Sequence, residues 1–89
     1  MPFYLKKPIP IEARQITMEN LVQLMEWSHA SVVKHADGTP SGMMVYTLEG
    51  SMTASIGDYL VKGVQGEFYF CNKIIFEATY TEIPEQKYG

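Results

Sequence analysis

The strongest constraint on the fold is a series of short runs, in the second half of the chain, that alternate apolar and polar side chains. In residues 51–56, Met52, Ala54 and Ile56 alternate with hydroxyl-bearing residues. A period of two residues is typical of a strand with one buried face. Turns rich in glycine separate the runs, which predicts two antiparallel hairpins. The predicted strand pairs are residues 43–48 with 51–56 and residues 59–62 with 67–71.

The first half of the chain predicts one main helix at residues 18–29. Thr17 is the expected N-cap, because its hydroxyl can accept a hydrogen bond from an amide of the first turn. The apolar side chains follow the helical period of 3.6 residues and predict one buried stripe. That stripe consists of Met18, Leu21, Val22 and Met25.

The remaining segments are shorter. Residues 8–16 alternate like a strand, and Pro8 and Pro10 place its start at a sheet edge because proline donates no hydrogen bond. Residues 31–35 form a short run around the β-branched Val32 and Val33 and predict another strand. Asn72 is expected to cap a short helical turn over residues 73–78, and residues 79–83 to add a final strand.

The composition fits one folded domain. The chain has 89 residues, 46% hydrophobic and 19% charged, which excludes a coiled coil, a collagen and a large two-domain enzyme. No apolar stretch has the length of a membrane span, so no membrane partner is expected. We predict an α+β domain over residues 1–83, with one main helix packed on a small, strongly bent antiparallel β-sheet that is partly barrel-like. Residues 84–89 are expected to form a flexible tail.

The charge and the cysteine content limit the classes of binding partner and the cellular compartment that we expect. The net charge is −3, and only Lys6 and Lys7 are adjacent basic residues, so we expect no extended nucleic acid as a partner. Net charge does not exclude a local basic pocket. The single cysteine, Cys71, cannot form an internal disulfide, which fits a reducing cytoplasm. The first residues show no secretory leader, so we expect the cell interior.

No catalytic residue, metal site or cofactor is predicted. His29 and His35 lack the spacing of a zinc motif, and no glycine cluster matches a phosphate-binding loop. Two interpretations of Cys71 are open: a packed side chain, or a reactive thiol near Lys73.

Aromatic residues crowd into residues 59–76, and a small sheet with one helix cannot cover both of its faces. The aromatic side chains are therefore either all part of the core, or some form a surface for a ligand or partner. Two interpretations of Trp27 are also open. A second element covers its side of the helix, or it is an exposed anchor for a partner, since tryptophan is enriched in binding hot spots.

Several segments together resemble a family of short proteins that is widespread in tailed bacteriophages and prophages. They are Lys-Lys-Pro-Ile-Pro-Ile-Glu-Ala-Arg-Gln at residues 6–15, Gly-Asp-Tyr-Leu-Val-Lys-Gly at 57–63, Gly-Glu-Phe-Tyr-Phe-Cys at 66–71 and Phe-Glu-Ala-Thr-Tyr at 76–80. One departure is Phe70, where the family commonly has proline, and it favours an uninterrupted strand here. Most members have no assigned activity, so the resemblance supplies no catalytic residues.

The resemblance implies a phage accessory protein in the host cytoplasm. Our hypothesis is non-enzymatic binding by a homo-oligomer that sequesters a nucleotide-like immune signal, an anti-defence role. The base would stack on Tyr59 or Tyr69, and Arg14, Lys62 or Lys73 would bind its phosphates. The alternatives are an inhibitor that binds a host protein through Trp27 and a sheet edge, a minor phage assembly protein, and a small enzyme or redox protein acting through Cys71.

Overall fold

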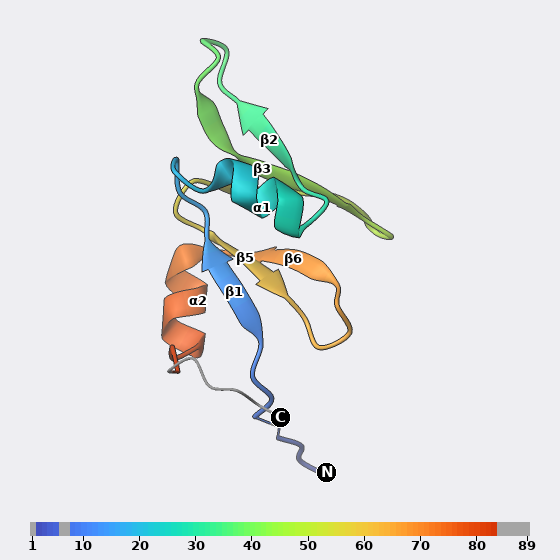
Figure 1. Ribbon diagram of the computed structural model, residues 1–89. Coiled ribbons are helices and arrows are strands. Elements are labelled where there is room, and N and C mark those ends of the chain that lie inside the picture. Colours follow the sequence, from blue (N-terminus) through green and yellow to red (C-terminus); the bar gives the residue numbers. More distant parts are fainter. Residues whose placement is uncertain (1, 6–7, 84–89) are drawn as a thin grey trace.

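The computed structural model describes residues 2–5 and 8–83. This part of the chain is α+β and mostly strand, as predicted, but it forms two three-stranded antiparallel sheets (Figure 1). We call the sheet with strand order β1-β5-β6 sheet A and the sheet with order β2-β3-β4 sheet B. The elements are β1 (Glu12–Gln15), α1 (Leu21–Trp27), β2 (Ser31–Lys34), β3 (Pro40–Thr47), β4 (Gly50–Ser55), β5 (Tyr59–Lys62), β6 (Phe68–Cys71) and α2 (Lys73–Thr79).

Both predicted hairpins are confirmed, β3 with β4 and β5 with β6. The prediction of one bent, partly barrel-like sheet under one main helix is wrong. Neither sheet closes into a barrel within the described residues, and the two helices have seven residues each. The strands form two sheets because β1 pairs with the distant β5, with Ala13 opposite Val61. The strands between them in the chain, β2, β3 and β4, then form a sheet of their own.

The chain passes from sheet B to sheet A at Gly57 and Asp58. Gly57 has a φ of 103°, a conformation that glycine adopts without steric cost. The Asp58 carboxylate accepts hydrogen bonds from the backbone N–H of Ser55 at 3.0 Å and of Lys73 at 2.9 Å. One side chain therefore ties the end of β4 to the start of α2.

The core lies where both sheets and α1 meet, and Figure 1 shows α1 between the strands of the two sheets. Leu24 of α1, Met43 of β3 and Leu60 of β5 have no solvent exposure. Ile16, between β1 and α1, is also completely buried. The two sheets therefore share one apolar cluster.

Helix α1 is shorter than predicted, and the predicted buried face is largely wrong. Leu21 and Leu24 are buried, whereas the side chains of Met18, Val22 and Met25 are 52%, 63% and 37% exposed. Five of the seven helical residues are apolar, so the helical period alone does not select one face.

The cap of α1 also differs from the prediction. Asn20, not Thr17, occupies the N-cap position, and its side-chain oxygen accepts a hydrogen bond from the Thr17 backbone N–H at 2.9 Å. The predicted cap of α2 is confirmed. The Asn72 side chain accepts hydrogen bonds from the backbone N–H groups of Ile74 and Ile75.

Two predicted strand segments are corrected. Residues 8–11 are not in a strand, because Pro8 and Pro10 lack the amide hydrogens that pairing requires. Residues 80–83 follow α2 without forming a strand. The predicted tail at 84–89, like Lys6 and Lys7, lies outside the described residues.

Candidate binding site

The strand register divides the side chains of sheet A between two faces. Cross-strand partners share a face, so one face carries Glu12, Arg14, Leu60, Lys62, Phe68 and Phe70. The other carries Ala13, Gln15, Tyr59, Val61, Tyr69 and Cys71. We call these the α1 face and the α2 face, after the helix that supplies aromatic contacts to each.

The structure does not bring the five predicted ligand-binding residues together. Arg14 and Lys62 lie on the α1 face of sheet A, whereas Tyr59 and Tyr69 lie on its α2 face. Lys73 is the first residue of α2. Within one chain, Arg14 and Lys62 therefore lie on the opposite face of sheet A from both candidate stacking tyrosines.

On the α2 face, Tyr59 and Lys73 interact with neighbours from their own chain. The Tyr59 ring stacks on Phe76 with centroids 4.0 Å apart, and its hydroxyl donates a hydrogen bond to Glu77 at 3.0 Å. Lys73 pairs with the same carboxylate at 3.4 Å. Burial, followed by the Glu77 carboxylate, raises the pKa of the Tyr59 phenol. These contacts hold α2 against sheet A.

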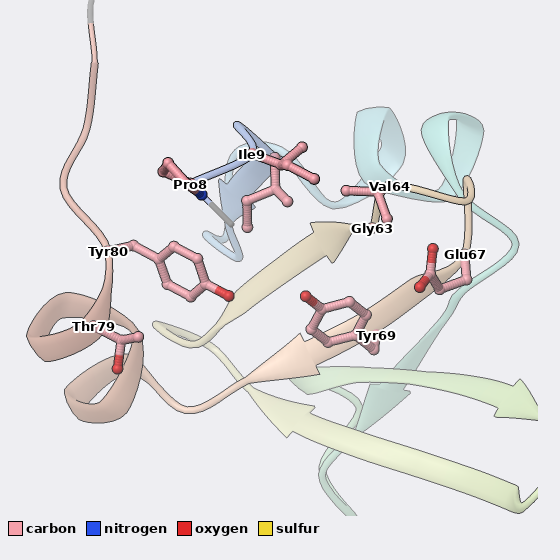
Figure 2. Close-up of a pocket in the computed structure, with 9 residues that line it drawn as sticks. Pro8, Ile9, Gly63, Val64, Glu67, Tyr69, Thr79 and Tyr80 are labelled. Atoms are coloured by element: carbon pink, nitrogen blue, oxygen red, sulfur yellow. The ribbon is translucent and has the colours of Figure 1, made fainter. Parts of the chain in front are cut away.

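Tyr69 lines a cavity of about 440 Å³, which we call the tyrosine groove (Figure 2). In Figure 2 the hydroxyls of Tyr69 and Tyr80 point toward each other across it. Burial, followed by the nearby Tyr80 phenol, raises the pKa of Tyr69. The groove is lined by Pro8, Ile9, Ile11, Gly63, Val64, Glu67, Tyr69, Thr79 and Tyr80.

The chemistry of the tyrosine groove does not match a phosphate group. Glu67 carries the only formal charge among its described lining residues, and that charge is negative. Its walls are mainly aliphatic and phenolic. An anionic ligand would therefore be repelled here, whereas an apolar or aromatic group with a hydrogen-bonding edge fits the lining.

On the α1 face, two cations meet two aromatic rings. We call this cluster, formed by Arg14, Trp27, Lys62 and Phe68, the cation–aromatic patch. The Trp27 and Phe68 rings meet edge to face, with centroids 5.1 Å apart. The Arg14 guanidinium lies 4.1 Å from the Trp27 centroid, and the Lys62 ammonium lies 6.0 Å from that of Phe68. Arg14 and Lys62 are diagonal neighbours on adjacent strands.

Phe68 is the member of this patch that sequence reasoning did not assign to a site. Its register opposite Lys62 places it beside the two cations. Alternation along the strand could have placed Phe68 and Tyr69 on opposite faces from the sequence alone. The position of Arg14 on the same face as Phe68 depends on the pairing of β1 with β5, which no local pattern predicts.

Trp27 is half-buried, because Phe68 of β6 covers its side of α1. Of the two interpretations of Trp27, the one in which a second element covers its side of the helix is confirmed. Its predicted role in binding a partner stays a prediction.

Both cations of the patch remain accessible. The Arg14 side chain is 42% exposed and donates a hydrogen bond to Glu12 at 2.9 Å, and Lys62 is exposed. Of the four basic residues that the structure describes, the other two, Lys34 and Lys73, lie elsewhere. With Glu12 the patch has a formal charge of +1, and its guanidinium and ammonium groups are suited to an anion.

The other candidate residues are His29, His35 and Cys71. Within residues 2–5 and 8–83, no three or more His, Cys, Asp or Glu side chains gather where they could hold a metal ion. His29 and His35 are exposed, and Cys71 is partly buried opposite Tyr59. No helix in the described residues has the length and apolar character needed to cross a membrane.

Comparisons with protein-family models, with curated proteins and with solved structures gave no match.

Proposed function

We propose that this chain is a non-enzymatic binding protein that captures a compact, phosphate-bearing, nucleotide-like ligand through the cation–aromatic patch. The observation that carries the proposal is the meeting of Arg14 and Lys62 beside two aromatic rings. The resemblance to phage proteins supports an anti-defence role in the cytoplasm of an infected bacterium, where the ligand would be an immune signal.

The chemistry of the patch supports phosphate recognition. The planar Arg14 guanidinium can donate two parallel hydrogen bonds to one phosphate, and Lys62 supplies a second positive charge. The Arg14–Glu12 pair is exposed, and pairs of this kind contribute only about 0–1 kcal/mol, so a phosphate can replace Glu12 at little cost.

The aromatic rings of the patch support recognition of a base. Stacking of a base on an aromatic side chain contributes about 1–3 kcal/mol and tolerates different bases. Two cations match a ligand with one or two phosphates better than a long polymer. We therefore assign base stacking to Phe68 in place of Tyr59 and Tyr69, with Trp27 and Arg14 packed beside it.

Equilibrium binding to a panel of mononucleotides and cyclic di- and trinucleotides tests this proposal. Arg14→Gln and Lys62→Gln should each weaken binding of the same panel member about tenfold, equivalent to ~1.4 kcal/mol. Lys34→Gln is the matched control, because Lys34 is an exposed cation on sheet B. Mass spectrometry should recover the ligand chemically unchanged. Equal binding by all variants, no binding of any panel member, or conversion of the ligand would overturn the proposal.

A second candidate, direct binding of a host protein, is favoured by the exposed apolar side chains. Among residues 2–5 and 8–83, fourteen large hydrophobic residues are exposed, more than the nine that form the buried core. Ile74 and Ile75 on α2 are 78% and 60% exposed. If this candidate is correct, Ile74→Ser with Ile75→Ser should abolish capture of a host polypeptide, whereas Lys62→Gln should leave it unchanged.

A further inference from the structure

The described segment before β1 carries three consecutive large apolar side chains that lie almost completely in solvent. Phe3, Tyr4 and Leu5 are 95%, 90% and 96% exposed. We call residues 3–5 the arm. In Figure 1 the arm runs away from sheet A. A contiguous apolar segment of this kind is a mark of an interaction surface.

The tyrosine groove offers a site of matching chemistry. Its volume of about 440 Å³ falls within the range typical of binding pockets, and Ile9, Ile11 and Val64 supply apolar walls. The hydroxyls of Tyr69 and Tyr80, seen in Figure 2, can form hydrogen bonds with the backbone of an extended segment.

We propose that two copies of the chain exchange arms, so that the arm of each copy occupies the tyrosine groove of the other. Pro8 and Ile9 form one wall of this groove, and the arm precedes that wall in the chain. Pro8 and Pro10 fix their own φ angles, and Ile9 is confined to extended conformations by the proline that follows it. These restrictions make residues 8–10 a stiff, extended wall of the groove.

The area of the contact supports a reciprocal dimer. Phe3 and Tyr4 can each bury roughly 200 Å², so one arm and the surface that it covers remove about 800 Å² from solvent. Two exchanged arms remove about 1,600 Å², the standard size of a stable protein–protein interface. A contact made by a single arm falls below that size, so exchange in both directions is required.

The inferred dimer is independent of the proposed ligand site. The groove lies on the α2 face of sheet A, and the cation–aromatic patch lies on its α1 face. Arm exchange therefore leaves the patch open in both copies.

The oligomeric state of the full chain is the first test, measured by size-exclusion chromatography with light scattering. The chain should elute with about twice its mass of 10.1 kDa. Phe3→Ser combined with Leu5→Ser should give a monomer with an unchanged circular dichroism spectrum, because the arm makes no core contact. Leu48→Ser is the matched control, since Leu48 is also completely exposed, and it should remain a dimer. A monomeric parent chain, or an arm variant that remains a dimer, would overturn the inference.

Disulfide trapping tests which groove the arm occupies. Two variants that carry Leu5→Cys or Val64→Cys, each with Cys71→Ser, are mixed and oxidised. A disulfide between them can form only between copies, and we expect a covalent dimer of the two variants. If no such dimer forms, while a single chain carrying both cysteines closes an internal disulfide, the arm occupies its own groove and the inference is wrong.

Discussion

Replacement of Trp27 by alanine should destabilise the fold, because the ring packs between Phe68 and the Arg14 guanidinium. Truncation of a fully buried tryptophan costs about 3–5 kcal/mol, and half-burial reduces this to about 2. Loss of the edge-to-face pair adds roughly 0.5–1.5 kcal/mol, and loss of the cation–π contact adds about 0.5. The expected loss is about 3–4 kcal/mol, a large part of the total stability of a small domain.

Urea unfolding followed by circular dichroism measures this loss, since Trp27 is the only tryptophan and its fluorescence disappears with the substitution. Tyr46→Ala is the control, because Tyr46 is 74% exposed and its loss should change the unfolding free energy by less than about 0.5 kcal/mol. A loss below about 1 kcal/mol for Trp27→Ala, together with abolished binding of a host protein, would refute the packing argument and make Trp27 a surface anchor.

Four further outcomes follow from the structure. Gly42→Ala should cost about 3 kcal/mol in urea unfolding, because the new Cβ would overlap the backbone carbonyl of Ala54 on the paired strand. Asp58→Ala should cost about 2 kcal/mol in the same assay, since two backbone amides lose a carboxylate acceptor. Asn72→Ala should lower the unfolding free energy by about 1 kcal/mol through loss of the α2 cap, with Asn72→Asp retaining most of it. The raised pKa of Tyr69 means that its contribution to stability is complete below pH 10 and is lost as pH rises through the folded pKa; ultraviolet titration should show one fewer late-ionising phenol in Tyr69→Phe.

Local signals predicted much of the secondary structure. The alternation in residues 51–56 and the glycines around it were sufficient for the hairpin of β3 and β4. Asn72 alone predicted where α2 begins, because its side chain accepts hydrogen bonds from backbone amides of the first turn. Both signals act within a few residues of the chain.

The features that sequence reasoning missed depend on distant contacts. The choice of β5 as the partner of β1 is made by burial of Val61 and Leu60, and no local pattern encodes it. In α1, Leu24 and Met25 have similar hydrophobicity, and only the position of the two sheets determines that Leu24 is buried.

The division of the candidate site has a local cause, the alternation of side chains along β5, which was not applied to Tyr59 and Lys62. Arg14 and Lys62 were expected to bind phosphate, and the structure does place them side by side on one face of sheet A. Tyr59 and Tyr69 lie on the other face. In β5, Tyr59 is adjacent to Leu60, which shares a face with Lys62, so the Tyr59 side chain points to the opposite side of the sheet. A one-residue difference in a strand reverses the direction of a side chain.

Native mass spectrometry of the protein purified gently from infected or defence-bearing bacteria tests the central claim most directly. The chain and a Lys34→Gln control should retain a small, phosphorus-containing mass, and Arg14→Gln combined with Lys62→Gln should lose it. Retention of the same small mass by all three proteins, or by none of them, would contradict capture at the cation–aromatic patch.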